Sequence, residues 1–104
     1  NDEVLALDQD ALGKEATCVI KDGDLRVYEK ELEDGSRAVG FFNLGVKPME
    51  LSFKDFAKLG LAGRQAARDL WRQKNLAVVD TAMDSLPLTI PAHGVVLCKF
   101  TTVK

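Results

Sequence analysis

The chain has 104 residues, of which 46% are hydrophobic and 29% are charged, and its formal net charge is −2. A chain of this length forms one domain that can fold alone, since folding buries roughly two thirds of the surface that the unfolded chain exposes. The slightly acidic balance leaves no basic field for phosphate groups, which argues against nucleic acid as a partner. No apolar run approaches the roughly eighteen residues of a membrane helix, so no membrane partner is expected and the compartment stays open.

The opening segment, residues 1–12, has the spacing of a helix. Its apolar positions recur at helical offsets, and Gly13 follows where glycine commonly ends a helix. These apolar positions are Val4, Leu5, Leu7, Ala11 and Leu12. No comparable helical pattern follows downstream. We therefore expect the apolar stripe of this helix to lie against a part of the protein outside this sequence.

The rest of the chain has the pattern of β-structure. β-branched and alternating runs predict strands, separated by turn signals such as Asp22-Gly23-Asp24 and the segment 33–36. The runs lie at residues 16–21, 25–32, 37–44, 49–53, 66–72 and 94–103. A shorter piece between Pro87 and Pro91 belongs at an edge or a strand entry, because proline donates no backbone hydrogen bond. About seven or eight short strands of this kind are typical of an antiparallel sandwich or a small barrel.

Two local patterns refine this prediction. Residues 37–44 (RAVGFFNL) are apolar on both sides, which predicts a strand covered on both faces. Residues 54–61 (KDFAKLGL) have the pattern of one helical turn that ends at Gly60, with Phe56 and Leu59 facing the core.

The two cysteines leave two interpretations open. Cys18 and Cys98 are too far apart in sequence to form a zinc-ligand pair or a redox C-x-x-C motif. They are either two buried thiols in strands, or one disulfide that joins the first strand to the last.

Catalytic and metal-binding constellations are not evident in the sequence. His93 is the only histidine and stands in a turn without a neighbouring histidine or acidic pair, so we interpret it as a turn residue. Hydrolysis of glycosides requires two carboxyl groups roughly 5–10 Å apart on a rigid scaffold. Many acidic residues lie instead in turns, where their charges are solvated: Asp22, Asp24, Glu33 and Asp34. We assign no catalytic residue, metal ligand or cofactor.

Trp71, in the run RDLWR, and Tyr28 are the candidate binding side chains. An exposed tryptophan on a sheet can stack against a sugar ring. A lone tryptophan in a domain of this size more often anchors a core or an interface. The same two interpretations apply to Tyr28.

Five blocks of the chain, taken in order, resemble a known family. Residues 3–16 (EVLALDQDALGKEA) match a run E-V-I-A-I-N-Q-D-P-L-G-K-Q-G, and residues 25–45 (LRVYEKELEDGSRAVGFFNLG) match L-E-V-W-x-K-P-L-x-D-G-S-R-A-V-A-L-F-N-R-G. Residues 53–61 (FKDFAKLGL), 67–77 (ARDLWRQKNLA) and 90–100 (IPAHGVVLCKF) match D-W-x-x-L-G-L, V-R-D-L-W-R-H-K-D-L-G and V-P-P-H-G-V-V-L-L-R-L. These runs are found in melibiase-type α-galactosidases of glycoside hydrolase family 27. There the first run closes the last helix of the catalytic domain, and the others belong to a C-terminal β domain.

The resemblance implies an all-β fold: an antiparallel Greek-key β-sandwich over residues 15–104. Residues 1–14 would be a linker and the end of the last helix of an absent (β/α)8 catalytic domain. The family's two catalytic aspartates belong to that barrel, as expected for loops at the ends of barrel strands, so no catalytic residue carries over to this chain.

The resemblance also implies a function. The chain would be a non-catalytic accessory domain of a retaining α-galactosidase-like hydrolase, which packs against and stabilises the barrel of the same polypeptide. The alternative is a carbohydrate-binding module that binds α-galactoside sugars through Trp71 or Tyr28. A secreted or periplasmic location stays open for the parent protein.

The sequence departs from the family at several positions. Asp8, Ala11 and Asn75 stand where the family usually has Asn, Pro and Asp, and residues 78–86 match poorly. These differences leave open whether the parent enzyme prefers galactose, N-acetylgalactosamine or β-arabinopyranoside substrates.

Overall fold

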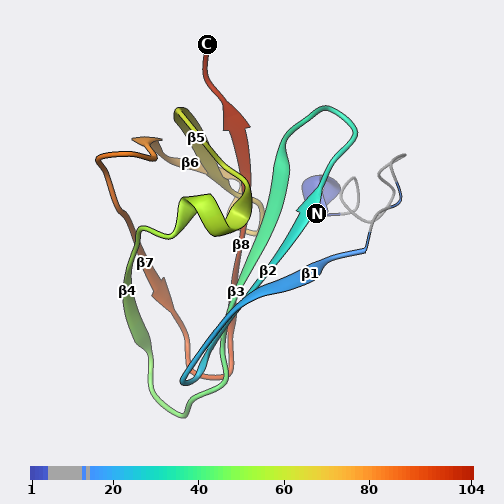
Figure 1. Ribbon diagram of the computed structural model, residues 1–104. Helices are drawn as coiled ribbons and strands as arrows, with labels where there is room; N and C mark the ends of the chain where they lie inside the picture. Colours follow the sequence, from blue (N-terminus) through green and yellow to red (C-terminus); the bar gives the residue numbers. More distant parts are fainter. Residues whose placement is uncertain (5–12, 14) are drawn as a thin grey trace.

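The computed structural model describes residues 1–4, 13 and 15–104 (Figure 1). Residues 2–4 form a helical turn. The rest of the helix that the opening segment predicts lies outside the described residues. Among the described residues, no helix is long and apolar enough to cross a membrane.

In the described part of the chain, eight antiparallel strands form two sheets, which confirms the predicted all-β sandwich. The larger sheet has six strands in the order β1-β2-β3-β8-β5-β6, and the smaller sheet pairs β4 with β7. Figure 1 shows β4 and β7 as a separate pair beside the larger sheet. The strands are β1 Thr17–Asp22, β2 Leu25–Glu31, β3 Arg37–Asn43, β4 Met49–Phe53, β5 Arg64–Asp69, β6 Lys74–Asp80, β7 Leu86–Ile90 and β8 Val95–Thr102.

The connections are of the Greek-key kind. Strands β5 and β6 form a hairpin, β7 crosses to the small sheet, and β8 returns to lie between β5 and β3. Pro87 lies on β7, which pairs with β4 in the two-stranded sheet and is therefore an edge strand. An edge strand is the position predicted for this proline, because proline donates no backbone hydrogen bond.

The core lies between the two sheets and contains a chain of four aromatic rings. Alternation along β2, β3 and β8 directs every second side chain toward β4 and β7. Phe41 packs edge-on against Phe53 at 5.0 Å between ring centroids, Phe53 against Phe56 at 5.3 Å, and Phe56 against Phe100 at 6.3 Å. These contacts join both sheets to the short helix between them.

That short helix, η1 (Phe56–Leu59), confirms the predicted helical turn. Phe56 and Leu59 are buried, as the spacing predicts. Gly60 ends the turn with φ of 72°, and its N–H donates to Ala57 O at 3.0 Å. Glycine suits this position because it adopts the left-handed conformation at no steric cost.

Several predicted boundaries are wrong. The strand expected over residues 66–72 ends at Asp69, and residues 70–73 form the turn to β6. Strand β6 has no counterpart among the predicted runs. Strand β3 is covered on one side only in part, since Phe42 is 37% exposed although Ala38 and Gly40 beside it are buried.

Both cysteines are free, so they do not form the disulfide that the sequence left open. The alternative prediction of two buried thiols is confirmed for one cysteine and wrong for the other. Cys98 on β8 is buried, but Cys18 on the edge strand β1 is exposed. Strands β2 and β3 lie between them. Three strand spacings amount to about 14 Å, whereas a disulfide requires Cα atoms within about 7 Å.

Candidate functional site

The two candidate sugar-stacking residues lie in different elements. Trp71 is 54% exposed in the β5–β6 turn, not on a sheet face as predicted. Tyr28 lies on β2, is 38% exposed and contacts the ring of Phe42 edge-on at 5.5 Å. The two surface hollows described below include neither residue. A role of Trp71 or Tyr28 in sugar binding stays a prediction.

Tyr28 and Phe42 belong to an apolar patch on what we call the outer face, the side of the six-stranded sheet that points away from β4 and β7. The strand register places Tyr28 beside Gly40 and Leu97 in one row, and Phe42 between Arg26 and Val95 in the next row. A Cβ added at Gly40 would approach Phe42 Cε1 to 2.8 Å, so the glycine leaves the space that the ring occupies. The patch is well ordered by packing but is open to solvent at its two rings.

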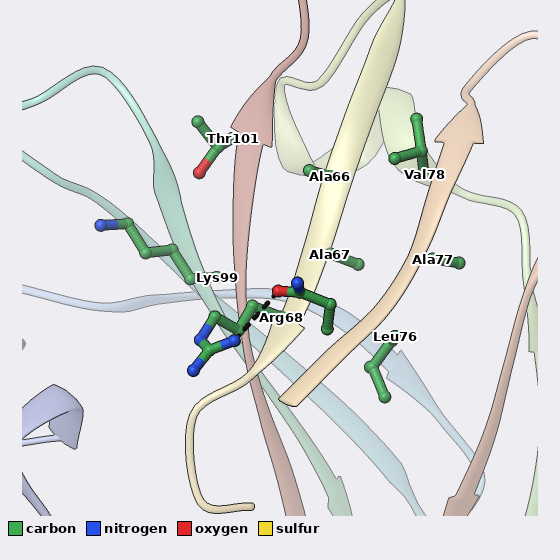
Figure 2. Close-up of a pocket in the computed structure, with 9 residues that line it drawn as sticks. Ala66, Ala67, Arg68, Leu76, Ala77, Val78, Lys99 and Thr101 are labelled. Atoms are coloured by element: carbon green, nitrogen blue, oxygen red, sulfur yellow. Dashed lines mark hydrogen bonds between the residues drawn. The ribbon is translucent and has the colours of Figure 1, made fainter. Parts of the chain in front are cut away.

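Next to this patch, the outer face has a shallow hollow of about 410 Å³ over β5, β6 and β8. Figure 2 shows Lys99 and Thr101 of β8, Ala66 and Arg68 of β5 and Val78 of β6 around it. The hollow forms because side chains on its floor, such as that of Ala66, are small. Val78, which lines the hollow, is 50% exposed. The hollow therefore combines apolar walls with two cationic side chains.

Both cations have acidic partners. Arg68 donates to both carboxylate oxygens of Glu3, at 2.8 and 3.1 Å, and to Asn75 Oδ1 at 3.0 Å. The hydrogen bond lowers the pKa of Glu3 and raises the pKa of Arg68. Lys99 Nζ lies 3.1 Å from Asp34 Oδ2. The hollow is therefore close to electroneutral and has no free anion-binding group among these residues.

A second hollow of about 270 Å³ lies between β6 and β7 and is lined by Asp69 and Arg72. Asp69 is only 2% exposed, and its carboxylate accepts hydrogen bonds from Arg72 N–H and Arg72 Nη1, both at 2.9 Å. A buried carboxylate needs such partners. These bonds hold the β5–β6 turn, so they assign Asp69 a role in the structure of the turn.

The arrangement offers no chemistry for glycoside cleavage among the residues described. The first hollow is lined by no carboxylate and the second by Asp69 alone, whereas a retaining mechanism uses two carboxyl groups about 5–5.5 Å apart. The four turn acids named from the sequence are exposed, and His93 is an exposed turn residue whose N–H donates to Gly45 O at 3.0 Å. Across residues 1–4, 13 and 15–104, no three His, Cys, Asp or Glu side chains gather as a metal site requires.

The sequence reasoning missed the polar contacts between the first residues and the β5–β6 turn. Glu3 and Arg68 are 65 positions apart in the chain, so no local pattern pairs them. One signal was available, because Asn1 is a favoured residue to precede the first turn of a helix.

Together, the two antiparallel sheets and the core between them define a β-sandwich domain. Residues 22–100 match the family described as the alpha-galactosidase C-terminal beta sandwich domain. The chain is 31% identical over 103 residues to a protein of Aspergillus flavus named probable alpha-galactosidase A, and 32% identical over 105 residues to alpha-galactosidase A of Cellvibrio japonicus. The chain therefore belongs to the C-terminal β-sandwich domains of family 27 α-galactosidases.

Solved structures agree with this family. Alpha-galactosidase I of Mortierella vinacea superposes with a TM-score of 0.87 at 27% identity, over 97% of this chain and 26% of that one. A family 27 β-L-arabinopyranosidase of Geobacillus stearothermophilus gives 0.83 at 27% identity, over 100% of this chain and 23% of that one. The sequence match to the Aspergillus protein covers 98% of this chain but 18% of that protein. The sequence match to the Cellvibrio protein covers 93% of this chain but 26% of that protein. In these relatives the domain is one part of a longer polypeptide.

Proposed function

We propose that this chain is the non-catalytic C-terminal accessory domain of a retaining α-galactosidase-like glycoside hydrolase. Its role is to pack against the catalytic (β/α)8 barrel of the same polypeptide and to stabilise it. Residues 15–104 are the accessory domain, and residues 1–14 are the end of the last barrel helix and a linker. The helical turn at residues 2–4 and the start of β1 at Thr17 support this boundary.

The observation that carries the proposal is the incomplete cover of strand β3. Val39 and Phe41 on its core side are fully buried, whereas Phe42 on the outer face is 37% exposed beside the half-covered ring of Tyr28. The sequence of this strand is that of a strand buried on both sides. The outer side of β3 is therefore apolar, as in a covered strand, although the described residues of this chain cover only part of it.

Physical chemistry favours another layer of protein on this face. Removing apolar surface from water contributes about 25 cal/mol per Å², and contiguous apolar patches commonly mark contact surfaces. The family membership supplies the occupant, since relatives carry this domain at the end of a much longer chain. The barrel is the part of such a chain that holds the reactive carboxyl groups, because barrel enzymes place them on loops at strand ends.

Three proteins test the proposal: the full-length polypeptide, the same polypeptide without residues 15–104, and the 104-residue chain alone. Each is assayed for hydrolysis of a chromogenic α-galactoside. We expect no turnover by the 104-residue chain and a shorter half-life of activity at elevated temperature for the truncated enzyme. Turnover by the 104-residue chain, or a truncated enzyme as long-lived as the full-length one, would overturn the proposal.

A further inference from the structure

We infer that Arg68 and the β5–β6 turn, residues 70–73, form the joint by which this domain holds residues 1–4 of the last barrel helix. The inference rests on the proposed function and deepens it, because it names the residues that couple the two parts. The partner is the helical turn at residues 2–4, together with Asn1, in the same polypeptide.

The Asn1 side chain begins the helical turn. Its Oδ1 accepts hydrogen bonds from Glu3 N–H at 3.0 Å and from Val4 N–H at 3.4 Å. An asparagine in this position satisfies amide groups that have no partner within the helix. These two bonds fix the Asn1 side chain to the helical turn.

The same side chain is bound to the β5–β6 turn. Asn1 Nδ2 donates to Leu70 O at 2.6 Å and to Trp71 O at 3.2 Å, and Gln73 Nε2 donates to Asn1 Oδ1 at 2.7 Å. One amide group therefore both caps the helix and attaches it to the sandwich. These bonds hold the helical turn at a defined position against the β5–β6 turn.

Arg68 and Glu3 add a second point of attachment, two residues further along the chain. The guanidinium group donates to both oxygens of the Glu3 carboxylate, at 2.8 Å from Nη2 and at 3.1 Å from Nε. Arg68 Nη1 donates to Asn75 Oδ1 at 3.0 Å, and this bond orients the guanidinium group toward Glu3. Two attachments, at Asn1 and at Glu3, resist rotation of the helical turn as well as sliding.

The turn is organised to present these groups. Asp69 binds Arg72 N–H within the turn, and Leu70 N–H donates to Leu97 O of β8 at 2.9 Å. Gln73 has φ of 53°, an uncommon value for a residue other than glycine. Such a conformation persists where surrounding contacts hold it, and it often has a functional reason. The exposed ring of Trp71 lies in the same turn and adds apolar area next to the joint.

The first experiment measures amide hydrogen exchange of Glu3 and Val4 by NMR in the 104-residue chain. We expect Glu3→Gln and Arg68→Gln each to accelerate this exchange about fivefold, the size of a partly exposed ion pair. The double variant should be no faster than either single one, and Glu3→Lys combined with Arg68→Glu should restore protection. Glu50→Gln is the matched control, since Glu50 also accepts hydrogen bonds but lies on β4 and contacts Thr89.

The outcomes of this experiment separate cleanly. Equal exchange in the wild type and in Glu3→Gln, or the same acceleration in Glu50→Gln, would overturn the joint. Additive effects of the two single variants would do the same, because independent residues do not form one contact.

The second experiment measures the half-life of activity in the full-length polypeptide. We expect Asn1→Ala and Arg68→Gln to shorten it about fivefold and Glu50→Gln to leave it unchanged. If the domain deletion shortens the half-life but Asn1→Ala and Arg68→Gln do not, the joint is overturned and the proposed function stands. If the deletion has no effect, the proposed function itself is overturned.

Discussion

Asp69 and Cys98 face each other across β5 and β8 as direct partners in the strand register. Both lie on the core side of the sheet, with 2% and 0% of their surface exposed. Burial, and to a smaller extent the negative charge of Asp69, raise the pKa of the Cys98 thiol to about 12. A buried thiol that stays protonated is a poor nucleophile, so Cys98 acts as a small core residue.

We predict that a thiol reagent modifies one cysteine in the folded chain and two in the unfolded chain. Cys18 is exposed and reacts in the native state at pH 8, whereas Cys98 reacts only on unfolding. Mass spectrometry after iodoacetamide treatment, with and without urea, measures the number of labels. In Cys18→Ser, native labelling should vanish. Rapid modification of both thiols in the folded chain would contradict the structure. Modification of neither thiol in the folded chain without reductant would contradict it as well.

We predict very different costs for one substitution at two adjacent positions of β3. Phe41 is fully buried and packs against Phe53, so Phe41→Ala should cost about 3–5 kcal/mol of unfolding free energy. Phe42 is 37% exposed on the outer face, so Phe42→Ala should cost about 1 kcal/mol or less. Urea unfolding of both variants of the 104-residue chain measures the difference. Similar losses at the two positions would show that the outer face is as well covered as the core.

We predict a pH-dependent contribution from Asp34. The Ser36 hydroxyl, then the Ser36 amide and Lys99, lower the pKa of Asp34 to about 2. Because the unfolded chain binds this proton near pH 3.9, ionised Asp34 stabilises the fold above about pH 4. This contribution is lost as the pH falls from about 4 to about 2.

The measurement compares wild type with Asp34→Asn by urea unfolding at pH 7, 5 and 3. The variant should be less stable at pH 7 and 5, and the difference should shrink at pH 3. Ser36→Ala removes the main hydrogen-bond donor to Asp34. In this variant the acid-induced loss of stability should therefore occur at higher pH than in the wild type. A stability difference that is the same at all three pH values would exclude Asp34 titration as its source.

We predict that the fluorescence of Trp71, the only tryptophan, does not respond to galactose or raffinose at millimolar concentration. The ring lies in a turn whose backbone carbonyl is bound by Asn1, and it lines neither of the hollows described. A titration of the 104-residue chain followed by emission spectra measures this. A saturable change would support the carbohydrate-binding alternative, and its loss in Arg68→Gln would place the sugar near the joint.

The sequence by itself determined the class of fold and much of its inner layer. Alternation placed Val39 and Phe41 on one side of a strand, and the local spacing of Phe56, Leu59 and Gly60 specified the short helix. These features depend on neighbours two to four positions apart, which a sequence displays directly. The block pattern also identified the family, because its motifs span nearly the whole chain.

Only the tertiary structure decided where the strand before Trp71 ends, how far apart the cysteines lie, and which residues meet Arg68. The chain leaves β5 after Asp69, where the buried carboxylate binds Arg72, and this moves Trp71 from a sheet face into a turn. The pairing of Glu3 with Arg68 joins residues 65 positions apart. Such contacts follow from the order and register of strands, which long-range packing selects and local spacing does not encode.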